Sequence, residues 1–160
     1  MRFVQIFNNG QSWDHHSSIT TELPKRCQEI DRPAAALVQD LKRRGLLDTT
    51  LVHWGGEMGR LPTIQVPVGT DGTERVGRDH NTYGFSMWVA GGGIKQGYVH
   101  GETDEFSHHA VTDVVTNHDW LATVLHLFGL DHQQLNYRVG SRSLALVENP
   151  QAQVVNKILA

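Results

Sequence analysis

The chain has 160 residues, a formal net charge of −3 and 19% charged residues. Its length predicts one domain over residues 1–160, and its weak negative charge argues against nucleic-acid or membrane-surface partners. The single cysteine, Cys27, excludes an intrachain disulfide framework and a cysteine-rich zinc site, and no apolar run reaches the roughly 18–20 residues of a membrane span.

The first half of the chain predicts a strand, a helix and a second strand in turn. The apolar segment "RFVQIF" (2–7) is typical of a short buried strand. Between Thr21 and Arg44 apolar residues recur at helical spacing, with Cys27 on the packed face, and Pro33 predicts either a kink or the start of a second helix. "TLVHW" (50–54) predicts the second strand, which leads into the glycine-rich turn "GGEMGR" (55–60).

The second half adds a long loop, a strand and a helix. Residues 61–82 show no sustained period, as expected for a long loop, and "FSMWVAG" (85–91) predicts a third strand. Residues 117–131 predict a helix with Asn117 as its N-cap and Gly129 as its C-cap. Its expected buried face consists of Leu121, Val124, Leu125 and Phe128, and a weaker helical stretch is expected at 151–160. This order predicts an α/β fold, a layered αβα domain with a largely parallel sheet.

Polar clusters lie at the ends of the predicted strands. Asp14 and His16 follow the first strand, Glu57 follows the second, and His80 precedes the third. Because ligands gather at the carboxyl ends of parallel strands, we expect these loops to meet at one edge of the sheet. Asp14 and His16 are two residues apart, so both can point the same way in an extended loop while His15 points elsewhere. The pattern predicts a divalent metal site built by Asp14, His16, Glu57 and His80.

Two further residues lie beside the predicted ligands. Arg60 is placed to hold a tetrahedral oxyanion such as phosphate or sulfate through paired hydrogen bonds. Asp79 is a candidate ligand, a candidate general base, or an acceptor that orients the imidazole of a neighbouring histidine. A plainer interpretation makes Glu57 an exposed turn residue and Arg60 its surface ion-pair partner.

Taken together, these motifs resemble the sulfatase-like family called domain of unknown function 1501, or DUF1501. The resemblance extends over essentially the whole chain, from about Arg2 to the C-terminus. The segments that carry it are "WDHH" (13–16), "DRPAAALVQDLKRRGLLDTTLVHWGGEMGR" (31–60), "GRDHNTYGFSMWVAGGGIKQGYVHG" (77–101) and "DWLATVLHLFGLD" (119–131).

The DUF1501 family is in turn similar to the alkaline phosphatase and sulfatase superfamily, which implies the fold and the ligand roles. Asp14 and His16 resemble an Asp/His pair on one metal, and His80 resembles the histidine that completes its shell. Glu57 stands where the superfamily has an acidic ligand of a second metal. Here the chain departs from the pattern, because Met58 stands in place of a histidine ligand and cannot bind the metal in its stead.

The resemblance also implies that the chain corresponds to the C-terminal half of a longer fold. In the superfamily the nucleophile and another metal aspartate come from an N-terminal part. A sheet divided in this way exposes an edge and an apolar face, so we expect self-association or pairing with a missing N-terminal half. The chain's own N-terminus has too few apolar residues for a secretory signal, whereas longer family members imply a periplasmic or exported location.

Two functions follow from the sequence. The first is a metal-dependent hydrolase that acts on a small anionic ester, a sulfate or a phosphate, with zinc as the expected ion and calcium, manganese or iron as alternatives. The second is a non-catalytic metal-binding or interaction module. Met58 and the absence of an activated nucleophile pattern among the serines and threonines favour the second.

Overall fold

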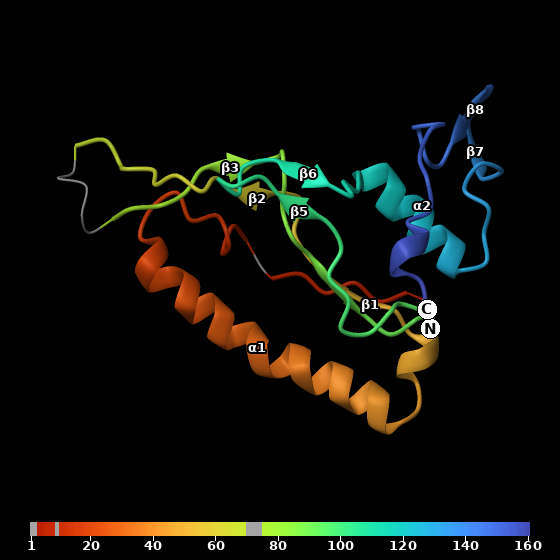
Figure 1. Ribbon diagram of the computed structural model, residues 1–160, viewed down its shortest axis with the longest axis horizontal. Coiled ribbons are helices and arrows are strands. Elements are labelled where there is room, and N and C mark those ends of the chain that lie inside the picture. The colour runs from red at the N-terminus through yellow and green to blue at the C-terminus, as the bar shows by residue number, and fades with distance from the viewer. Residues whose placement is uncertain (1–2, 9, 70–74) are drawn as a thin grey trace.

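The computed structural model describes residues 3–8, 10–69 and 75–160 (Figure 1). The main helices are α1 (Ile19–Arg43) and α2 (Asn117–Leu127), and two single turns of 3₁₀ helix are η1 (Leu47–Thr49) and η2 (Asn156–Ile158). The strands are β1 (Val52–Trp54), β2 (Gly59–Arg60), β3 (His80–Asn81), β4 (Trp88–Ala90), β5 (Glu102–Thr103), β6 (Ala110–Thr112), β7 (Asn136–Val139) and β8 (Arg142–Ala145).

The long helix α1 runs along one side of the molecule (Figure 1). It is one continuous element of 25 residues that includes Pro33, so a second helix does not begin there. None of its residues is buried, and Cys27, which the sequence placed in the core, is exposed. No helix in the described ranges is long and apolar enough to cross a bilayer.

The strands form four separate pairs, each antiparallel: β1 with β4, β2 with β3, β5 with β6, and β7 with β8. The predicted second and third strands are therefore partners, with Val52 opposite Ala90 and Trp54 opposite Trp88. These pairs make the described structure a mixture of helices and small antiparallel sheets. The layered αβα arrangement with a largely parallel sheet stays a prediction.

The predicted first strand does not form. Residues 3–8 have neither helical nor strand structure. Their apolar side chains face solvent, with exposed fractions of 71% for Phe3, 66% for Val4, 82% for Ile6 and 77% for Phe7. The sequence-based expectation of a buried strand is therefore wrong for residues 3–7, because this segment pairs with no neighbouring strand in the described structure.

A small core forms where α2 meets the C-terminal segment. Ala122, Leu125, Val147 and Ala152 pack together, with Leu135 against them. The predicted buried face of α2 is wrong at Leu121 and Phe128, which are 37% and 56% exposed. The C-terminal segment packs on the side of α2 that carries Ala122, so that side is the one covered.

Side-chain hydrogen bonds fix both the start of α2 and its contact with the tail. The N-cap of α2 is Thr116 and not the expected Asn117, because Thr116 and Asp119 form a reciprocal capping box. The hydroxyl of Thr123, fully buried, donates to the carbonyl of Asp119 at 2.7 Å and accepts from the N–H of Val155 at 2.9 Å. Only the turn η2 of the expected tail helix forms.

Replacing Thr123 by Val tests the contact between α2 and the tail. Valine keeps the shape but leaves the N–H of Val155 without its acceptor, so we expect the free energy of unfolding to fall by about 1–3 kcal/mol. Urea unfolding followed by far-UV circular dichroism measures it. The matched control is Thr112→Val on exposed β6, expected within about 0.5 kcal/mol of the parent. Equal losses in the two variants would contradict the assignment.

Candidate metal centre

The site forms where the segment 13–18 meets the chain around β3. The N–H of Arg78 donates to the carbonyl of His15 at 2.9 Å, and the N–H of Ile19 donates to that of Val76 at 2.9 Å. Gly77 makes this approach feasible: a Cβ atom there would lie 2.0 Å from the carbonyl carbon of His16. Any side chain at position 77 would therefore push the two segments apart.

Strand pairing brings the second half of the site into place. Strands β2 and β3 are antiparallel, with Arg60 opposite His80. The N–H of Leu61 continues the contact by donating to the carbonyl of Asp79 at 2.8 Å. Residues separated by more than sixty positions along the chain thus lie side by side, as the sequence predicted for Asp14, His16 and His80.

The three residues converge on one point. The Oδ1 atom of Asp14 lies 2.9 Å from Nε2 of His80 and 3.0 Å from Nε2 of His16, and the two Nε2 atoms are 3.2 Å apart. Together they form a group able to hold a metal ion. A tetrahedral zinc with ligands at about 2.0–2.2 Å needs ligand atoms roughly 3.3–3.6 Å apart. The observed separations fall a few tenths of an ångström short of this, so the donor set fits a small divalent ion after slight opening.

The cluster is open on one side. The side chains of Asp14, His16 and His80 are 26%, 39% and 43% exposed. With three protein ligands and solvent access, the arrangement is that of a site that keeps a position for water or substrate.

Arg60 contacts the cluster directly. Its guanidinium donates to Oδ1 of Asp14, to the carbonyl of Trp13 at 3.3 Å and to the carbonyl of Arg78 at 3.2 Å. The alternative ion pair with Glu57 does not form in the described structure. Arg60 therefore stands beside the candidate ligands, where it also ties together the two chain segments that build the site.

Two residues surround His16 and His80 without joining the ligand group. Asp79 accepts the N–H of His80 at 2.8 Å, and its Oδ1 lies 3.8 Å from Nδ1 of His16. Gln65 lies closer, with Oε1 2.8 Å from Nδ1 of His16. A carbonyl oxygen at Nδ1 favours the tautomer that carries its proton there and leaves Nε2 free for a metal. Sequence reasoning missed Gln65, because a single glutamine in a long loop gives no signal.

Glu57 lies outside this group. It is exposed, and within the described residues the candidate ligand group contains only Asp14, His16 and His80. Its neighbour Met58 offers no ligand of the kind the superfamily has at that position. A role for Glu57 on a second ion stays a prediction.

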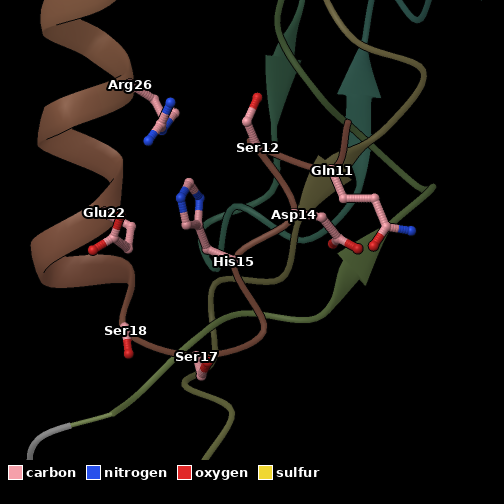
Figure 2. A pocket seen from close by; sticks show the side chains of 8 residues that line it. All are labelled: Gln11, Ser12, Asp14, His15, Ser17, Ser18, Glu22 and Arg26. Carbon is pink, nitrogen blue, oxygen red and sulfur yellow. The ribbon is translucent and has the colours of Figure 1, made fainter. Parts of the chain in front are cut away.

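His15 points away from the metal ligands, as the sequence predicted. It is 8% exposed and lines a polar pocket of about 430 Å³ together with Ser12, Glu22 and Arg26. Figure 2 shows the ring of His15 on the side of the loop that faces α1, while the carboxylate of Asp14 points away from that helix. The hydroxyl of Ser12 is buried and has no hydrogen-bond partner among the described residues. The side chains of Asp14 and His15 thus leave the loop in opposite directions, and Asp14 also contributes to the lining of the pocket.

The environment of Asp14 keeps it ionised. The hydrogen bond from His80, followed by the hydrogen bond and charge of Arg60, lowers the pKa of Asp14 from its ordinary 3.8 to about 2. An anionic carboxylate over the whole physiological pH range is what a metal ligand requires.

Comparison with known protein families places the chain in one family. Residues 1–159 match the family described as Protein of unknown function (DUF1501). Because the match covers nearly the whole chain, the chain belongs to the DUF1501 family, and the resemblance seen in the sequence is confirmed at that level. No curated protein and no solved structure matches the chain. Relationship to the sulfatases and alkaline phosphatases, and correspondence to a C-terminal half, stay predictions.

The lowered pKa of Asp14 has a measurable consequence for stability. Since the pKa is below the unfolded value of about 3.8, the ionised form stabilises the fold above about pH 4, and this contribution is lost as the pH falls towards 2. A carbon-detected NMR titration of the Asp14 carboxyl should give a midpoint near 2. His80→Ala should raise the midpoint, whereas His126→Ala on exposed α2 should not. A midpoint near 3.8 in the parent chain would refute the contacts of Asp14 with His80 and Arg60.

Proposed function

We propose that the chain is a metal-dependent hydrolase domain acting on sulfate or phosphate esters, with Asp14, His16 and His80 as ligands of one divalent ion. The supporting observation is that the three ligand atoms lie 2.9–3.2 Å apart at an open position. Zinc is the proposed ion because two imidazoles and one carboxylate suit it, with manganese, iron and calcium as alternatives. A bound ion would lower the pKa of its water and polarise the ester oxygen.

The chain's own groups have distinct parts in this proposal. Arg60 would bind the oxyanion of the substrate, because its guanidinium already lies against the Oδ1 atom of Asp14 and presents a second cation beside the ligands. Gln65 and Asp79 would orient His16 through its Nδ1 atom. Glu57 is proposed as a ligand of a second ion in the complete site.

A non-catalytic metal-binding module is the second candidate. Met58 in place of the expected ligand favours this module. The guanidinium of Arg60 also favours it, because it donates hydrogen bonds to Asp14 and to two backbone carbonyls. These contacts use three of the five N–H donors of the guanidinium, which leaves the Nε hydrogen and one Nη1 hydrogen for an anion.

Metal analysis of the purified chain separates these candidates. Asp14→Ala with His80→Ala removes two of three ligands, so bound zinc measured by mass spectrometry should fall from about one equivalent to background. The matched control is Asp48→Ala with His126→Ala, an exposed pair of the same residue types that should retain the metal. Metal retained by the first variant would refute the site. Metal lost without turnover of aryl sulfate or phosphate esters by the parent would favour the binding module.

Glu57→Gln tests the proposed second ion. If Glu57 is a ligand, the parent should bind a second equivalent of zinc at high concentration and the variant only the first, since glutamine lacks the charge that a divalent ion selects. Isothermal titration calorimetry gives both stoichiometries. Identical isotherms for parent and variant would remove Glu57 from the ligand set.

A further inference from the structure

The chain exposes far more surface than a compact monomer of its size. Its accessible area is 12,098 Å², whereas a folded monomer of 17.9 kDa is expected to expose about 8,000 Å². The described parts of the segment between β2 and β3, residues 61–69 and 75–79, extend from the body and contribute exposed side chains such as Ile64 and Val68 to this area (Figure 1). The remainder includes apolar surface, because only five hydrophobic side chains of the described residues are buried.

One part of this uncovered surface is a groove between α1 and the strands β1 and β4. It has a volume of about 600 Å³. Its lining is mainly apolar, from Ile30, Ala34 and Val38 of α1 and from Trp54, Trp88 and Ala90 of the strands. The rings of Trp54 and Trp88 lie nearly parallel, with centroids 6.3 Å apart, and the residues are 37% and 38% exposed.

A second uncovered element is the N-terminal segment of residues 3–7. Phe3, Val4, Ile6 and Phe7 are all more than 60% exposed. No backbone hydrogen bond of residues 3–8 to another described residue is present in the structure. Residues 3–10 carry no charge, so burying them requires no desolvation of an ionised group.

We propose that a second copy of this chain covers the groove, and that residues 3–7 of each copy occupy the groove of the other. Each chain carries both complementary parts, an apolar groove and an uncharged apolar segment with free backbone groups. Reciprocal use of the same two patches is the closed two-fold arrangement that homodimers commonly adopt. Edge addition of the segment to β1 or β4, each of which has one strand partner, would satisfy its N–H and C=O groups.

The available area suits a stable dimer. A standard interface covers about 800 Å² of each partner, and permanent homodimers cover more. The surface that the chain exposes beyond the expectation for a monomer is about 4,000 Å² over the whole chain, and the groove and residues 3–7 supply only a part of it. The inference is independent of the proposed metal chemistry, since none of the three metal ligands lines the groove.

Sedimentation velocity over a range of concentrations tests the dimer. The parent chain should sediment with twice the 17.9 kDa mass. Ile6→Asp places a charge in the interface of both copies and should raise the dissociation constant by roughly 100-fold or more. Ala35→Arg, an exposed α1 position lining the groove, should do the same from the other side. The matched control is Val68→Asp, an exposed position between β2 and β3, which should remain dimeric.

The single cysteine supplies a second readout that does not depend on mass. Cys27 lines the groove and is exposed in one copy, so the dimer should cover it. Reaction of the native chain with a thiol reagent should be slow at high concentration and faster on dilution or in Ile6→Asp. A parent chain that stays monomeric at all concentrations overturns the proposal. Association that occurs only with a different protein also overturns it. Association that Ile6→Asp and Ala35→Arg leave unchanged overturns the assigned surface.

Discussion

The contact between residues 13–18 and the chain around β3 is the constraint on which the candidate site depends. Two backbone hydrogen bonds join the segments, and the approach is so close that position 77 tolerates only glycine. Arg60 adds three further hydrogen bonds across the same junction. Because Asp14 and His16 lie on one segment and His80 on the other, the geometry of the donor set is set by this junction and not by any single element.

The charge arrangement at Asp14 imposes a competition. Its Oδ1 atom receives Arg60 and lies within hydrogen-bond distance of both imidazoles. An incoming cation would replace these donors on Oδ1 or bind the other carboxylate oxygen. The hydrogen bonds that lower the pKa of Asp14 therefore also compete with metal binding at its Oδ1 atom.

The candidate metal ligands were easier to predict from the sequence than the arrangement of the strands. Asp14, His16 and His80 were identifiable because their residue types are uncommon together, and the alternation around His15 assigned its direction. Gly77, Gln65 and the strand pairing of Arg60 with His80 leave no such signal, because each depends on which segments meet in space. The expected N-terminal strand does not form at residues 3–7 for the same reason, and Arg2 lies outside the described residues. An apolar pattern specifies what a segment prefers to bury, and a neighbouring element must be present for burial to occur.

The separation of the ligands along the chain gives an ion a structural effect as well as a chemical one. Asp14 and His80 are 66 positions apart, so an ion held by both closes a loop of that length. Closing such a loop restricts the unfolded chain much as a covalent cross-link does, but reversibly and under control of free metal concentration. Because the core of this chain is small, metal binding would contribute a large share of the free energy of folding. The concentration of free metal would then determine how often residues 13–18 and the chain around β3 remain in contact.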